Sequence, residues 1–142
     1  AIVVIAVSAV AILLHPLGLV GKSLWPPSPI CPIPTDTQFP FFVVIAIIEA
    51  GTFGLGVAFL IWGYRFVRWF RYRWQRVCVF IALAWSLGNW SLHDGLHMIA
   101  GIDMTQLLFI EFGFHVTLIL ATCLIVAALA VEAGYRRIAL KR

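Results

Sequence analysis

Long apolar runs separated by shorter polar segments dominate the chain and predict membrane-spanning helices. Four runs stand out, at residues 1–20, 41–63, 77–100 and 104–131. Each is long enough to cross the hydrocarbon core of a bilayer, which takes about 20 residues of helix. We therefore expect an all-α integral membrane protein, a single domain built as a bundle of four transmembrane helices.

Three polar segments connect or follow these runs. Residues 21–40 contain six prolines, which exclude a regular helix and favour extended, polyproline-like backbone. Residues 64–76 contain five arginines interleaved with aromatic residues, and residues 132–142 form a basic tail. The third and fourth runs are joined by a tight turn, where Asp103 and Gln106 resemble a capping box that opens the fourth helix.

Composition supports a membrane protein. Hydrophobic residues make up 63% of the chain and charged residues 11%, and the mean hydropathy is +1.02. Soluble domains carry roughly 25% charged residues. The net charge of +4 does not indicate a nucleic-acid partner, because arginines with aromatics between two apolar runs are typical of a membrane interface. The three cysteines are widely spaced and form no metal or disulfide motif.

The distribution of basic residues predicts the orientation in the membrane. Of ten lysines and arginines, five lie in residues 64–76 and four in residues 132–142, which leaves Lys22 alone in the Pro-rich segment. The positive-inside rule then places both basic segments and both chain ends in the cytoplasm. The Pro-rich loop becomes extracytoplasmic, and we expect a bacterial-type inner or plasma membrane as the location.

Ionisable residues within the apolar runs are the candidate functional residues, because charge is expensive in hydrocarbon. They gather in the outer half of the expected bundle, roughly 5–16 Å below the outer helix ends at about 1.5 Å per residue. Two pairs are spaced i,i+4, so that each pair shares one face of its helix. The group comprises Glu49, His93 and His97, and Glu111 and His115.

Histidines and carboxylates from facing helices are how helical bundles build metal sites. We therefore interpret these five residues as ligands of one or two transition-metal ions, with Fe, Cu or Zn as the metals that imidazole and carboxylate suit. Asn89, Asp94 and His15 are expected to support the ligands from outside the coordination sphere. A bound metal in this position is compatible with redox or oxygen chemistry on a lipophilic substrate.

Other interpretations remain open at this stage. A haem or chlorophyll could take His93, His97 or His115 as axial ligands, although the outer side offers only Lys22 to a propionate. The chain could also be an accessory subunit of a larger electron-transfer or photosynthetic-type complex, in which the cluster binds a quinone or is purely structural, or it could form a homo-oligomer. Each polar residue could simply bond across helices. No zincin motif or other catalytic signature is present in the sequence.

Overall fold

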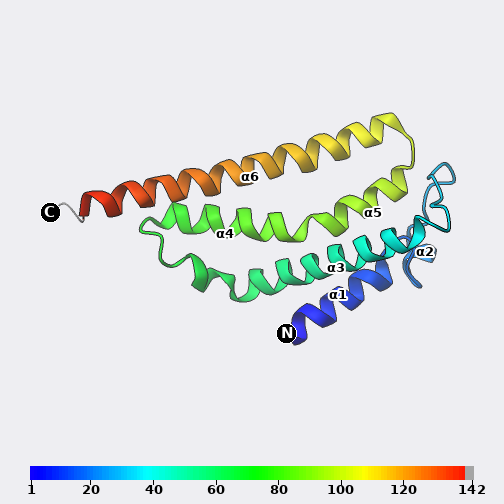
Figure 1. Cartoon of the computed structure of the whole chain (residues 1–142), viewed down its shortest axis with the longest axis horizontal. Helices are drawn as coiled ribbons and strands as arrows, with labels where there is room; N and C mark the ends of the chain where they lie inside the picture. Colours follow the sequence, from blue (N-terminus) through cyan, green and yellow to red (C-terminus); the bar gives the residue numbers. More distant parts are fainter. Residues whose placement is uncertain (140–142) are drawn as a thin grey trace.

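The chain is all-helical in the computed structural model, which describes residues 1–139 (Figure 1). Four long helical segments run back and forth, and the third of them is broken in the middle. The elements are α1 (Ile2–Leu14), α2 (Gly21–Leu24), α3 (Phe39–Trp62), the 3-10 helix η1 (Gly63–Val67), α4 (Arg73–Gly88), α5 (Trp90–Ala100) and α6 (Met104–Ala139).

The helices stand side by side in a row. α1 packs along α3, α3 packs against α4 and α5, and these two pack against α6. Figure 1 shows α4 and α5 lying between α3 and α6, with α1 on the far side of α3. α1 and α6 therefore occupy opposite ends of the row, and no extensive contact joins them within residues 1–139.

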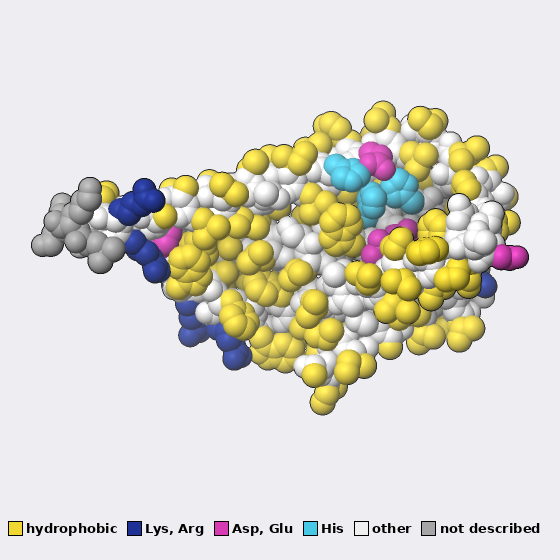
Figure 2. Space-filling view, viewed as in Figure 1, with side chains coloured by type: hydrophobic (Ala, Val, Ile, Leu, Met, Phe, Trp, Pro, Cys, Tyr) yellow, Lys and Arg dark blue, Asp and Glu magenta, His cyan; other side chains and the backbone are white. Residues whose placement is uncertain are grey.

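Two helices are long and apolar enough to cross a membrane, the segment Phe39–Val67 and α6. Their large apolar side chains point outward over much of their length, and examples are Ile48, Leu108, Phe112 and Ile119. Apolar side chains cover most of the visible surface, while lysine and arginine gather near the C-terminal end of α6 (Figure 2). Burying such a surface in lipid satisfies the hydrophobic effect, so the structure fits a membrane protein.

Small residues on α3 allow its neighbours to approach closely. A Cβ added to Gly54 would lie 2.5 Å from Ser8 Oγ on α1, and a Cβ added to Gly56 would lie 2.9 Å from the Cα of Gly88 on α4. Such separations are too short for real side-chain contacts. Glycine at these two positions therefore fixes how α3 meets α1 on one side and α4 on the other.

The contact between Gly56 and Gly88 gives a direct test of this packing. Gly56→Ala should lower the free energy of unfolding by about 1–3 kcal/mol, because the added methyl group overpacks backbone against backbone. Gly51→Ala on the same helix is the matched control, since its Cβ would meet no atom within 4 Å. Reversible unfolding in mixed detergent micelles measures both. Equal stability of the two variants would contradict the close contact.

Several helix boundaries differ from those expected. α1 ends at Leu14 rather than near residue 20, because His15 takes an extended conformation (ψ 146°) ahead of Pro16. The expected helix 77–100 begins earlier, at Arg73, and divides at Asn89 into α4 and α5. Asn89 Nδ2 donates to the Trp85 carbonyl at 2.7 Å, and such local bonds from a side chain to the preceding turn bend helices.

The basic segments also differ from the expectation. Most of the expected tail 132–142 continues α6 as regular helix to Ala139, and its last three residues lie outside the described part of the chain. Residues 63–67 form η1 rather than irregular connection. A small core of Val67, Phe70, Val79 and Ala128 packs at this end of the molecule.

Buried polar residues hold α4 to α6 at the same end. Gln75 is fully buried, accepts a hydrogen bond from the Tyr72 amide at 3.0 Å and donates to the Ala128 carbonyl at 3.0 Å. Glu132 accepts from the Arg71 amide at 3.2 Å and pairs with Arg136 at 3.0 Å. These bonds tie the segment before α4 to the C-terminal half of α6.

The opposite end is ordered by the Pro-rich loop and the turn before α6. The Trp25 indole donates to the Leu14 carbonyl at 2.6 Å, and the Ser28 amide donates to the Met98 carbonyl at 3.0 Å, so the loop folds back over α1 and α5. Asp103 Oδ1 accepts from the amides of Thr105 and Gln106. The Asp103 half of the expected capping box is therefore present, whereas the Gln106 side chain donates to the Asp103 carboxylate and not to the Asp103 backbone.

Candidate metal centre

The histidines and carboxylate of the main polar cluster come from two antiparallel helices joined by a tight turn. α5 supplies His93 and His97, and α6 supplies Glu111 and His115. The turn reverses the chain at Gly101, whose φ of 63° favours glycine. A Cβ there would also lie 2.8 Å from Ser28. The turn thus sets the register in which His97 lies opposite Glu111, and His93 lies one helical turn deeper, opposite His115.

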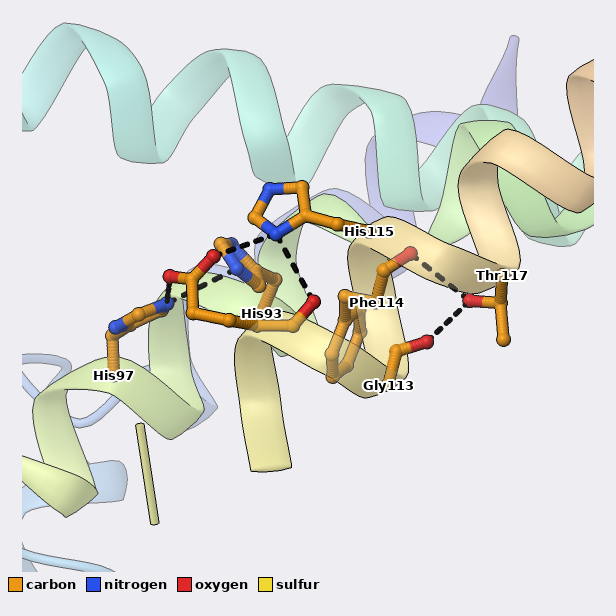
Figure 3. Close-up of polar contacts among 7 residues, drawn as sticks. His93, His97, Gly113, Phe114, His115 and Thr117 are labelled. Atoms are coloured by element: carbon orange, nitrogen blue, oxygen red, sulfur yellow. Dashed lines mark hydrogen bonds and ion pairs between the residues drawn. The ribbon is translucent and has the colours of Figure 1, made fainter. Parts of the chain in front are cut away.

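The Glu111 carboxylate bridges two histidines from different helices. Its Oε1 lies 3.0 Å from His97 Nε2 and its Oε2 lies 2.6 Å from His115 Nδ1. His97 Nε2 also lies 3.0 Å from His93 Nε2. Figure 3 shows His93, His97 and His115 converging on this one region between α5 and α6.

Three of these residues form a group that could hold a metal ion. One ligand atom each from His93, Glu111 and His115 lies within 4.8 Å of the others. Two imidazoles and one carboxylate are a donor set used by zinc and by non-haem iron. The two Nε2 atoms of His93 and His97 can either share one proton or be joined by a common ion, because two neutral acceptors cannot face each other at 3.0 Å.

Aromatic rings pack against the cluster on the side nearer to Asn89, where α4 and α5 meet at a bend. The His93 ring lies 5.2 Å from the Phe114 ring and 5.3 Å from the His115 ring, measured between centroids. Phe114 in turn stacks on Trp85 at 5.6 Å, and the Trp85 indole donates to Thr117 Oγ1 at 3.0 Å. Neither Phe114 nor Thr117 was expected from the sequence, because both are common residues of apolar helices.

The cluster opens toward the surface of the row. The side chains of Glu111 and His115 are 47% and 50% exposed, and that of His97 is 28% exposed. Figure 2 shows the histidines and an acidic side chain together on the visible face, surrounded by apolar side chains and far from the arginines. The cause is the position of α6, which has a helical neighbour on one side only.

The remaining residues expected in or near the site form a separate cluster. His15 Nε2 pairs with Asp94 Oδ2 at 2.9 Å, so these two residues bond to one another rather than to His93 or His97. The ionisable groups close enough to influence Glu49 are Asp94 and His15, which places Glu49 with this pair and outside the metal-ligand group. Glu49 Oε2 is buried and has no hydrogen-bond partner within residues 1–139.

Asn89 also takes a role other than the one expected. It is fully buried at the division between α4 and α5 and bonds to the Trp85 carbonyl. Its contribution is the bend of the helix that carries His93, one turn further along. The structure therefore brings together His93, His97, Glu111 and His115, and it sets Glu49, Asp94, His15 and Asn89 apart from them.

Comparison of the chain with known protein families, with curated proteins and with solved structures found no match.

Proposed function

We propose that this chain is a small integral membrane protein that binds a transition-metal ion through His93, Glu111 and His115, with His97 positioning Glu111. The observation that carries this proposal is the convergence of three ligand-type side chains from two helices within 4.8 Å. They converge where nearly every neighbouring surface side chain is apolar. Polar groups in such a position are expensive, and coordination to an ion offsets the cost of bringing them together.

The proposed topology has four spans with both ends in the cytoplasm. The 16 residues of α4 and the 11 of α5 follow one another around Asn89, and a helix of that combined length extends about 40 Å. The 13 residues of α1 pack along α3 and continue into the chain around His15. Because the arginines lie at the opposite end from the histidines, the positive-inside rule supports an extracytoplasmic position for the metal site.

The donor set supports redox or oxygen chemistry on a lipophilic substrate. Two imidazoles and a carboxylate leave coordination positions open, as in non-haem iron and catalytic zinc sites. When bound there, such an ion supplies Lewis-acid or electron-transfer chemistry. The chain itself contributes the hydrogen bonds that two histidines donate to the Glu111 carboxylate, which fix the orientation of the imidazoles.

Elemental analysis of the purified protein tests the proposal. We expect one or two equivalents of a transition metal per chain, lost in His93→Ala. The matched control is His15→Ala, which removes a histidine of similar depth that lies outside the group and should retain the metal. Absence of stoichiometric metal from the wild-type protein, even after supply of Fe, Cu and Zn, would contradict the proposal.

An optical spectrum distinguishes a bare ion from a tetrapyrrole. The rings of His93 and His115 pack edge to face at 5.3 Å, and His93 packs edge to face on His97 at 4.4 Å. Direct ring contacts leave no gap for a porphyrin plane between these histidines, and a carboxylate between them suits an ion better. We expect no Soret band, and a Soret band that disappears in His115→Ala would favour haem or chlorophyll instead.

A second role, as a subunit of a larger membrane assembly, is favoured by the exposure of the cluster. Half-exposed Glu111 and His115 would face lipid if α6 had no further neighbour, and a covering chain would remove them from hydrocarbon. Phe112 lies between them in sequence and is 68% exposed.

A photo-crosslinking amino acid at Phe112 should therefore capture another copy or another membrane protein in native membranes, whereas one at Ile61 on α3 serves as the comparison. Crosslinks to lipid alone from both positions would contradict a covering subunit.

A further inference from the structure

We infer that the open cavity lined by α1, α3, α5 and the Pro-rich loop binds a lipophilic phenol or hydroquinone, with its hydroxyl group on Asp94. The cavity has a volume of about 670 Å³, which lies within the range of small-molecule sites. Binding in this cavity stands on its own geometry. Only the further step, that the bound molecule is the substrate of the metal centre, depends on the proposed function.

The walls of the cavity are mostly apolar and partly aromatic. α3 contributes Phe39, Phe42 and Val43, and the loop contributes Pro32 and Ile33. A second cavity of about 490 Å³ adjoins the first, and the two share Ala11, His15 and Ser91 as walls. The second cavity is lined almost wholly by apolar residues of α1 and α5. Together they offer apolar walls against which an aromatic head and an alkyl tail can both pack.

The polar end of this space is formed by His15 and Asp94, and the Asp94 carboxylate is its hydrogen-bond acceptor. His15 Nδ1 accepts a hydrogen bond from the Leu17 amide at 3.2 Å, so in the neutral ring the proton lies on Nε2, which donates to Asp94 Oδ2 at 2.9 Å. Asp94 lines the cavity and its side chain is 29% exposed, so the carboxylate can accept a further hydrogen bond beside the one from His15. A ligand hydroxyl that donates to the Asp94 carboxylate would supply this further hydrogen bond.

Glu49 lies next to this cavity, but its side chain is not part of the cavity wall. Its Oε2 is buried and lacks a partner in the part of the chain that the structure describes, while Ala46 and Ala50 on either side of it line the cavity. Buried polar atoms in folded proteins are nearly always hydrogen-bonded. The Asp94 carboxylate, which does line the apolar cavity, favours a head group with hydroxyl donors over a ketone, an ether or an acyl chain.

The cavity also reaches the metal-ligand cluster. His97 lines the cavity wall together with Asp94 and Met98, and the same His97 ring bonds to Glu111 and His93. A molecule bound on Asp94 would therefore lie on the other side of one imidazole from the proposed metal. If the proposed function holds, this arrangement makes the bound phenol or hydroquinone its substrate.

The test measures binding of radiolabelled 2-decyl-1,4-hydroquinone to the wild-type protein in lipid nanodiscs under argon, with empty nanodiscs subtracted. We expect saturable binding at one molecule per chain. The dimethyl ether of the same compound has a similar shape but no hydroxyl donor. Its affinity should be lower by about tenfold or more. Equal binding of the hydroquinone and its ether would overturn the inference.

Two variants locate the binding in this cavity. Asp94→Leu removes the acceptor and should weaken hydroquinone binding about tenfold, and Ala46→Phe should block it by filling the cavity from its wall without touching the polar pair. Asp36→Asn, an exposed carboxylate of the same loop, should bind like wild type. Undiminished binding in both Asp94→Leu and Ala46→Phe would place the molecule elsewhere and overturn the inference.

A third variant separates this inference from the proposed function. His115 does not line the cavity, so His115→Ala should bind the hydroquinone normally while losing metal. Metal-free wild-type protein that still binds hydroquinone would support the cavity site and contradict the metal site. Wild-type protein that holds metal but binds the hydroquinone and its ether equally would support the metal site and contradict the cavity site.

Discussion

Replacing His115 by alanine is expected to abolish stoichiometric metal binding, whereas His97→Ala should weaken it by only about 10–100-fold, the usual effect of losing a residue that orients a ligand. The difference follows from the geometry. His115 provides one of the three ligand atoms that lie within 4.8 Å of each other. His97 bonds to Glu111 Oε1 and to His93 Nε2, so its main effect is to hold two ligands in place.

Competitive titration with a chromophoric chelator measures both variants against wild type. His15→Ala is again the matched control, because its imidazole bonds to Asp94 and should not affect metal affinity. A third variant, Glu111→Gln, keeps the shape of the side chain but removes its charge, and we expect a loss closer to that of His115→Ala. Identical affinities of the His97 and His115 variants would show that both histidines act in the same way, and the assignment of three ligands would then be wrong.

The part of the site on α5 and α6 could be predicted from the sequence because it depends on local rules. Each i,i+4 pair shares one face of its helix, and a tight turn makes the two helices antiparallel neighbours, so the two pairs can face each other. The turn is itself signalled by Gly101 and by the cap at Asp103. The register is not given by counting residues from the turn, because the count places Glu111 level with His93, whereas the structure pairs Glu111 with His97, one helical turn nearer the turn.

The position of Glu49 could not be predicted in the same way. Hydropathy shows which segments are apolar, but it does not show which helices become neighbours. In a closed bundle α3 would touch α6, and Glu49 could join the ligands there. In the observed row α4 and α5 separate α3 from α6 (Figure 1), so Glu49 lies with Asp94 and His15 instead.

Small residues on α3 determine which helices pack against it, and the effect of each residue depends on the helix that it contacts. Gly54 admits α1, and Gly56 admits α4 at Gly88. α3 is apolar around most of its circumference, so no hydrophobic stripe marks the face on which each partner would pack. The pairing of helices therefore emerges from backbone fit, which a pattern of hydrophobic and polar positions does not record.

Gln75 is a further residue whose importance the sequence did not show, and replacing it should lower the stability of the fold. In the sequence it is one polar residue among arginines at the end of a basic segment. In the structure it is 0% exposed and joins the Tyr72 amide to the Ala128 carbonyl on α6. It therefore connects α4 to α6 at the end of the molecule opposite to the metal-ligand cluster.

Gln75→Leu is expected to lower the free energy of unfolding by about 1–3 kcal/mol, because the Tyr72 amide loses its acceptor, whereas the Ala128 carbonyl lies inside α6 and keeps its helical hydrogen bond. Unfolding in mixed detergent micelles measures the change. The control is Gln106→Leu, which removes an exposed bond to Asp103 that water can replace, and it should cost less than about 1 kcal/mol. Because α4 and α6 would separate at the far end from His93 and His115, metal affinity in folded Gln75→Leu protein should change little. A destabilised variant that also loses metal would show that the two ends of α6 are coupled, and a variant as stable as wild type would contradict the buried connection itself.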